Sequence, residues 1–194
     1  MILLGAILAG MVVGVSLASL HKRPWSVPPL RKPWLAILSF LPQLVFLYLP
    51  ATRKWVPDEL TAAGLIVSLV LLLVFCWFNR QFSGVWLLAW GLFLNLLVIA
   101  ANGGFMPISP QTASRLVPPE TLAALGNGDR FGYKDILLLP EKTHLIWLSD
   151  FLLPPVGFSY QVAFSPGDAF IAAGAFWLMV MPGKALEAPK IILK

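Results

Sequence analysis

The chain has 194 residues, of which 58% are hydrophobic and 12% are charged, and its formal net charge at pH 7 is +5. Soluble domains carry roughly 25% charged residues, so this composition excludes an ordinary soluble protein and predicts an integral membrane protein. Most Lys and Arg residues fall in one class of loops, as membrane topology requires, and the positive charge therefore does not indicate nucleic-acid binding. The single cysteine, Cys76, excludes an intrachain disulfide and a thiolate metal cluster.

The first predicted membrane helix covers residues 1–20, an apolar stretch with the length of about 20 residues that a crossing needs. Its positive charges follow the apolar stretch, which favours a retained helix over a cleaved signal peptide. Gly10, Gly14 and Ala18 recur on one face, and small residues at this spacing allow another helix to pack closely. The pattern leaves open whether that partner helix belongs to this chain or to another.

The second predicted helix covers residues 34–49 and follows a loop, 21–33, that holds four basic residues and no acidic one. Such a loop is typical of the cytoplasmic side. Pro42 interrupts the helix because it removes one backbone hydrogen bond. The adjacent Gln43 needs a polar partner in lipid, either across a helix interface or on a bound ligand.

Two more helices are predicted over residues 60–78 and 84–101, joined by a short turn at Arg80. Asn95 lies near the middle of the second of them and, like Gln43, is expected to bond another helix or a ligand. The helix should end at Asn102-Gly103-Gly104, since Gly and Asn adopt the left-handed conformation that closes a helix end.

The last predicted helix covers residues 166–181, after a long segment, 102–165, that is too rich in polar residues and prolines to lie buried in lipid. Ser165 at the N-cap and Asp168 three residues later match a capping box. Gly174 belongs to a second face of small residues that favours tight helix packing. The segment 102–165 suits a strip on the membrane surface or a cap over the bundle.

These elements predict an all-α integral membrane protein, with residues 1–194 forming one domain of five transmembrane helices in a cytoplasmic (inner) membrane. The side of the first loop holds eight Lys and Arg residues, including Lys184, Lys190 and Lys194 of the C-terminal tail, against six on the other side. The positive-inside rule then predicts an outside N-terminus, a cytoplasmic C-terminus and an extracytoplasmic segment 102–165.

The sequence contains no motif of a known hydrolase, nucleotide-binding or metalloprotease site. The two histidines, His21 and His144, fall on opposite sides of a membrane of about 30 Å and cannot bind one metal or haem together. No catalytic residue, metal or cofactor is therefore predicted. Polar groups that could converge outside the membrane are Asn102, Ser109, Asp135, Asp150, Ser165 and Asp168.

Asp150 and Asp168 are the candidates for a metal-binding or catalytic site. If they met in the fold, two carboxylates beside a glycine-rich turn could hold a divalent ion or perform acid/base catalysis. The alternative is that each carboxylate caps or pins a loop.

Several short motifs resemble, in their order, a known family. They are Asn102-Gly103-Gly104 before Met106-Pro107, then Leu148-Ser149-Asp150 before a proline pair, and then Phe164-Ser165-Pro166-Gly167-Asp168. The chain resembles a bacterial integral-membrane family catalogued as a domain of unknown function, number five-three-one-seven. The resemblance covers nearly the whole chain, although Phe105, Ser149 and Pro166 stand where the family usually has Arg, Gly and Ile. It implies the fold and supplies no activity.

The leading functional hypothesis is a non-enzymatic accessory or scaffold subunit of a larger membrane complex, with the lipid bilayer and other membrane subunits as partners. The small-residue faces and the eight tryptophans support it. The alternative is the binding of an amphipathic small molecule, such as a quinone or a polyisoprenoid lipid, in an apolar groove. The candidate ligand-binding residues are Gln43, Asn95, Asn102, Asp150 and Asp168.

Overall fold

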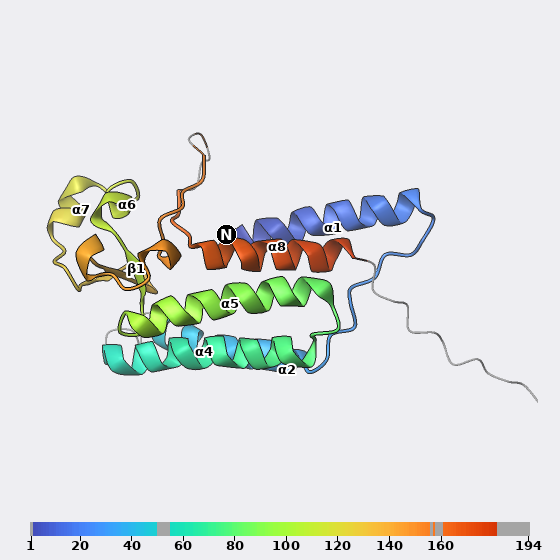
Figure 1. Ribbon diagram of the computed structural model, residues 1–194, viewed down its shortest axis with the longest axis horizontal. Helices are drawn as coiled ribbons and strands as arrows, with labels where there is room; N and C mark the ends of the chain where they lie inside the picture. Colours follow the sequence, from blue (N-terminus) through green and yellow to red (C-terminus); the bar gives the residue numbers. More distant parts are fainter. Residues whose placement is uncertain (1, 50–54, 156, 158–160, 182–194) are drawn as a thin grey trace, which may run out of the picture.

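The computed structural model describes residues 2–49, 55–155, 157 and 161–181, and it shows a bundle of long helices with a smaller cap at one end (Figure 1). The long helices agree closely with the ranges predicted from the sequence. The basic residues of the C-terminal tail, together with Arg53 and Lys54, lie outside the described residues. The long helices are α1 (Ile2–Leu20), α2 (Pro33–Gln43), α4 (Asp58–Phe78), α5 (Ser83–Ala101) and α8 (Pro166–Val180).

Among the described residues, three helices are long and apolar enough to cross a membrane: α1, α4 and α5. The other two predicted crossings correspond to shorter apolar helices, α8 and the stretch Pro33–Tyr48. In that stretch α2 passes into a π-helical turn, η1 (Leu44–Tyr48), directly after Pro42 and Gln43. The change of helix type follows the missing N–H of the proline, which interrupts the regular α-helical ladder.

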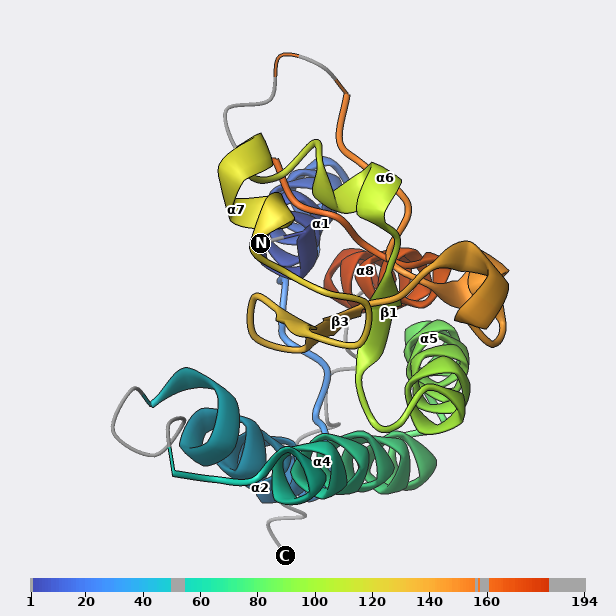
Figure 2. The ribbon, with the colours of Figure 1, turned by 90° about the vertical axis from the view of Figure 1, so that its left-hand side faces the viewer.

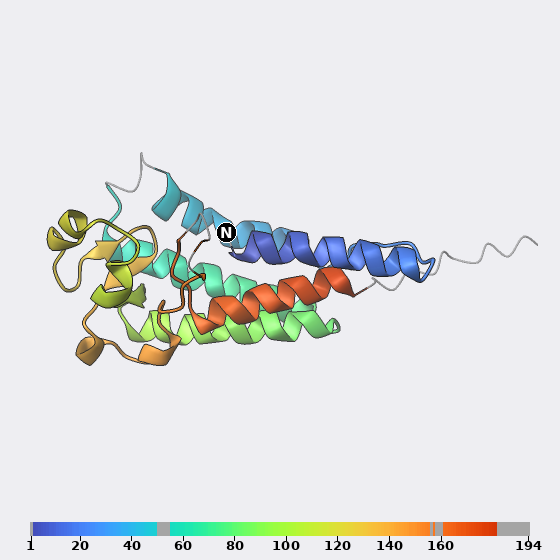
Figure 3. The same cartoon turned by 90° about the horizontal axis from the view of Figure 1, so that it is seen from above.

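The long helices pack side by side in the spatial order α2, α4, α5, α8, α1. Seen end-on, the row of helices is curved, and the cap lies at the end of the bundle that faces the viewer (Figure 2). The cap lies beyond the end of α5 and the start of α8 (Figures 1 and 3). The opposite end carries the loop 21–32 and the turn 79–82, and because these segments hold basic and no acidic residues we call it the basic end.

Glycines bring α5 and α8 into backbone contact. Gly84 and Gly91 of α5 face Gly174 and Gly167 of α8, so the two helices meet at matching glycines seven residues apart. A Cβ atom at Gly91 would lie 2.4 Å from the Gly167 carbonyl oxygen, and one at Gly174 would lie 2.7 Å from the Gly84 carbonyl oxygen. Only glycine permits this approach, which increases the van der Waals contact between two apolar helices.

The small-residue face of α1 packs on α8 of the same chain. Gly10 and Gly14 are its buried residues, and a Cβ at Gly10 would lie 2.7 Å from the Phe176 carbonyl oxygen. Gly14 approaches the backbone of Met179 in the same way, and Ala18 lines a cavity near the end of α8. The partner that the sequence left open is therefore α8, and this face is occupied within the chain.

Asn79 ties the first loop to the end of α4. Its side chain is fully buried, accepts a hydrogen bond of 2.6 Å from the Arg31 N–H and donates one of 2.9 Å to the Arg31 carbonyl. It also donates to the Phe75 carbonyl, one of the orphan groups at the helix end. Both backbone groups of Arg31 are thus bound, and this arginine is held beside Arg80.

The cap contains a small sheet that the all-α prediction missed, so that prediction is wrong here. Strand β3 pairs in parallel with β1 and antiparallel with β2. The strands are only two or three residues long, too short for the alternation of apolar and polar residues that reveals a strand. The cap elements are β1 (Met106–Ile108), α6 (Pro110–Ala113), α7 (Pro119–Ala123), β2 (Arg130–Phe131), β3 (Asp135–Leu137), η2 (Pro140–Lys142) and η3 (Ile146–Leu148).

Candidate functional site

The turn after α5 starts the cap and sets its position over the bundle. Gly103 and Gly104 have φ angles of 75° and 90°, the left-handed conformation that the sequence predicted. The Gly104 N–H bonds the Ile99 carbonyl, and a Cβ at Gly104 would lie 2.3 Å from the Ala62 Cβ of α4. The turn therefore passes directly over α4 and leads into β1.

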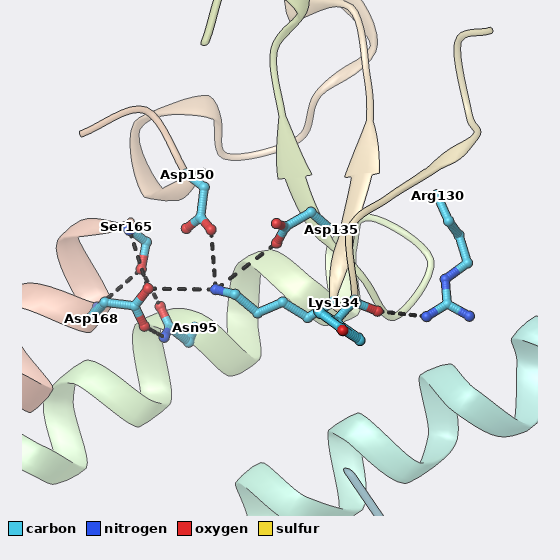
Figure 4. Close-up of polar contacts among 8 residues, drawn as sticks. Asn95, Arg130, Lys134, Asp135, Asp150, Ser165 and Asp168 are labelled. Atoms are coloured by element: carbon cyan, nitrogen blue, oxygen red, sulfur yellow. Dashed lines mark hydrogen bonds and ion pairs between the residues drawn. The ribbon is translucent and has the colours of Figure 1, made fainter. Parts of the chain in front are cut away.

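A cluster of charged and polar side chains lies where the cap meets α5 and α8 (Figure 4). Its centre is Lys134, which directly precedes β3 and whose carbonyl accepts a hydrogen bond from the Met106 N–H of β1. The Lys134 Nζ lies 3.1 Å from Asp150 Oδ2, 3.5 Å from Asp168 Oδ2 and 4.0 Å from Asp135 Oδ1. One ammonium thus joins carboxylates from three segments: β3, the loop after η3, and the start of α8.

Asp168 connects this cluster to the interior of the bundle. The predicted capping box is confirmed, because the Ser165 Oγ accepts from the Asp168 N–H and the Asp168 carboxylate accepts from the Ser165 N–H. Asn95 donates to Asp168 Oδ1 at 2.8 Å and accepts from the Ser165 hydroxyl at 2.8 Å. The polar residue in the middle of α5 is therefore fully engaged with the start of α8.

The electrostatic balance of the cluster is unequal, since three carboxylates share one ammonium. Burial raises the pKa of Asp150 above its ordinary value, and the nearby Lys134 lowers it only in part. Burial raises the pKa of Asp135 in the same way, again opposed by Lys134. For Lys134 burial favours the neutral amine, but attraction to Asp150, Asp168 and Asp135 outweighs it and raises the pKa. Lys134 is therefore charged at neutral pH.

Asp150 is the most enclosed member of the cluster, with a side chain only 1% exposed. Its N–H bonds the Pro107 carbonyl of β1, which fixes the loop against the sheet. Its Oδ1 has no hydrogen-bond partner among the described residues. A buried carboxylate in this state is costly unless it is protonated or paired with a charge, and Lys134 supplies the pairing.

Asp150 and Asp168, which the sequence suggested as ligands of a divalent ion, lie on either side of the Lys134 ammonium. Within the described part of the chain, no group of three His, Cys, Asp or Glu side chains is arranged to hold a metal. The Lys134 ammonium provides the positive charge that both carboxylates need. The sequence reasoning missed Lys134 because a lone lysine in a long polar loop carries no distinguishing pattern.

The other predicted ligand residues lie apart from this cluster. Asn102 caps α5, donating to the carbonyls of Val98 and His144 and accepting from the His144 N–H. It repeats, at the opposite end of the bundle, the way in which Asn79 binds Arg31. Gln43 is half-buried on α2, which packs on α4 away from α8 (Figure 2). Of the five candidates, the structure joins Asn95, Asp150 and Asp168.

The fold and this cluster define a mostly helical protein with three helices long and apolar enough to cross a membrane and a small mixed cap joined to the bundle by partly buried ion pairs. The model of a family of unknown function, DUF5317, matches residues 28–180, and the chain belongs to this family. The match includes every residue of the cluster and leaves out α1. No curated protein and no solved structure matches the chain.

Proposed function

We propose that this protein is a non-enzymatic accessory subunit that crosses the membrane five times and presents a rigid cap to a partner subunit. The observation that carries the proposal is that Lys134 contacts three carboxylates. These contacts connect the cap to the bundle. A group held in this way lacks the freedom to bind and release a substrate. Buried ion pairs of this kind are best attested as devices that specify an arrangement.

The alternating directions of the long helices and the charges of the loops support the proposal of five crossings with the cap outside the cell. The stretch Pro33–Tyr48 and α8 are short for a bilayer core of about 30 Å, since 15 helical residues span about 22 Å. Local thinning of the bilayer and the flanking side chains Trp34, Tyr48 and Trp55 offset this mismatch.

Thiol labelling of intact cells tests this topology. The native thiol is first removed by Cys76→Ser, a change at a buried position. We expect Gln111→Cys in the cap to react with a membrane-impermeant maleimide, while Ser26→Cys in the first loop reacts only after the membrane is permeabilised. Both positions are exposed, so access differs only through the membrane. The opposite labelling pattern would refute the topology.

The cap offers an apolar surface on its segment 139–151, beside the ends of α5 and α8. Trp147 is 75% exposed, and exposed apolar residues that gather on one segment mark an interaction surface. The short helix η3 contacts both α5 and α8, so this surface lies close to the membrane boundary. Aromatic side chains are enriched in the contact surfaces of membrane and soluble subunits. The exposed apolar residues are Leu139, Leu145, Ile146, Trp147 and Phe151.

Photocrosslinking in native membranes tests the accessory role. With the photoreactive residue p-benzoylphenylalanine in place of Trp147, we expect a specific adduct with another membrane protein. The same residue in place of Gln111, an exposed position on α6, is the matched control and should give no such adduct. Adducts with lipid alone at position 147 would indicate a membrane anchor and contradict the proposal.

A second function, binding of a polyisoprenoid or quinone, is supported by an apolar groove of about 370 Å³ between α2 and α4, whose lining includes Leu41, Phe46 and Val67. Gln43 lies next to the groove residue Pro42 and offers a polar contact at its edge. Mass spectrometry of the purified protein should then detect the lipid, and Val67→Trp should abolish the signal. Val12→Trp, at an exposed position on α1, is the control.

A further inference from the structure

The basic end holds a cavity of about 440 Å³ lined by Arg31, Phe78, Arg80, Gln81 and Trp86. Arg31 comes from the first loop, and the other four residues come from the end of α4, the turn 79–82 and the start of α5. Both arginines border this cavity, and Asn79, which directly precedes Arg80, binds both backbone groups of Arg31. Two cations far apart in the sequence therefore share one wall, and the contacts that hold them are built into the fold.

Among the residues that the structure describes, the charged side chains at this cavity are all basic. Lys32 lies over the Phe78 ring, with its Nζ 4.2 Å from the ring centroid. The Arg80 guanidinium stacks on Trp77 at 4.5 Å and donates to the Trp77 carbonyl at 3.1 Å, so its position is anchored. In the described part of the chain, no carboxylate lies within ion-pair distance of Arg31, Lys32 or Arg80.

A second, apolar cavity of about 210 Å³ adjoins the first. It shares Arg80 and Trp86 with the basic cavity and is otherwise lined by side chains of α4 and α5 that include Leu73, Val85 and Ala89. Because Leu73 and Ala89 lie one to two helical turns inside the bundle, this cavity runs from the basic end toward the middle of the membrane helices. A cationic cavity joined to an apolar one matches a molecule with an anionic head and a hydrocarbon chain.

We infer that this pair of cavities binds one anionic phospholipid. Arg31 and Arg80 hold the phosphate, Lys32 contributes to the field around it, and one acyl chain lies between α4 and α5 against Ala89. Arginine suits the site because its planar group donates two hydrogen bonds to one phosphate. The inference requires insertion of the bundle in a membrane and is independent of the proposed topology, of the cap and of any partner subunit.

Native mass spectrometry of the full chain in neutral detergent tests this inference. We expect phosphatidylglycerol to bind at least tenfold more tightly than the zwitterionic phosphatidylcholine. Arg31→Gln and Arg80→Gln should each weaken phosphatidylglycerol binding about fivefold, the contribution of one basic residue near an anionic lipid. Arg23→Gln removes the same charge from the same end of the bundle but lines a different cavity, and should leave the affinity within twofold.

Two further variants separate a lipid from a free anion and from a folding defect. Ala89→Phe fills the apolar cavity, so it should abolish phosphatidylglycerol binding and leave any binding of inorganic phosphate unchanged. Arg80→Lys keeps the charge but loses the paired hydrogen bonds, so it should retain only part of the affinity, and it stands in for Arg80→Gln if that variant fails to fold. Equal binding of the two lipids, an equal effect of Arg23→Gln, or unimpaired lipid binding by Ala89→Phe would each overturn the inference.

Discussion

Lys134→Met is expected to destabilise the protein by about 2–3 kcal/mol, below the usual cost of removing one partner from a fully buried ion pair, because the Lys134 side chain is 34% exposed. The methionine matches the length of the lysine side chain, so the change removes the charge and little volume. Asp135, Asp150 and Asp168 would then face one another without a cation, and Asp150 is almost fully enclosed. Detergent unfolding curves of the purified variant measure the loss.

The control for this variant is Lys142→Met, at an exposed lysine of the same cap. It should change stability by less than about 0.5 kcal/mol, as surface substitutions generally do. Adding Asp150→Asn to Lys134→Met should recover part of the loss, since it removes a carboxylate that no longer has a partner. A Lys134→Met protein as stable as the wild type would show that the ion pairs do not hold the cap.

The deficit of Lys134→Met should also depend on pH. A carboxyl whose pKa is raised by folding contributes stability below its unfolded pKa of about 3.9 and loses it as the pH rises through the folded value. The pKa values of Asp135 and Asp150 are raised by burial and lowered by Lys134. Without Lys134 they rise further, so the variant should fall further below the wild type at pH 8 than at pH 5. A deficit equal at both values would contradict this account.

Gly91→Val should cost about 3 kcal/mol or more, at the upper end of what overpacking costs. Its Cβ would lie 2.4 Å from the Gly167 carbonyl oxygen and 2.8 Å from the Ile171 N–H nitrogen. Both contacts are to backbone, which cannot move aside as a flexible side chain can. The two helices must therefore separate, and the hydrogen bonds of Asn95 to Ser165 and Asp168 would be strained as well.

Gly5→Val is the matched control for this change. Gly5 lies in α1, and a Cβ there would meet no atom within 4 Å. The same substitution should therefore leave stability within about 1 kcal/mol, the range of helix propensities for ordinary residues. Both variants can be compared by unfolding in detergent. If Gly91→Val behaved like Gly5→Val, the backbone contact between α5 and α8 would not contribute to the fold.

The occupied small-residue faces change the basis of the accessory hypothesis. Gly10 and Gly14 of α1 and Gly174 of α8 suggested surfaces for another subunit, yet all three are buried within this chain. The partner-binding surface of the proposal is therefore the exposed cap segment around Trp147, which the sequence alone did not distinguish from a membrane-surface strip. The test of partner binding moves accordingly from the helices to the cap.

Local sequence was sufficient to predict the long helices, the capping box at Ser165 and Asp168, and the left-handed turn at Gly103 and Gly104. Each of these features depends on residues close together in the chain. The helices need a long apolar stretch, the capping box needs a side chain that bonds the nearby backbone, and the turn needs glycines without a Cβ. The membrane class and the family resemblance were likewise predicted from composition and short motifs. The family is confirmed over residues 28–180.

The tertiary structure alone decided the partners that lie far apart in the chain. It placed α1 on α8, brought Lys134 to Asp150 and Asp168, placed Arg31 and Arg80 at one cavity, and formed a sheet from strands of two or three residues. Composition and periodicity report how a residue relates to its near neighbours and to the solvent. Which distant groups meet depends on how the helices and loops pack. A buried charge or a close backbone contact is favourable only when its partner lies at the same place.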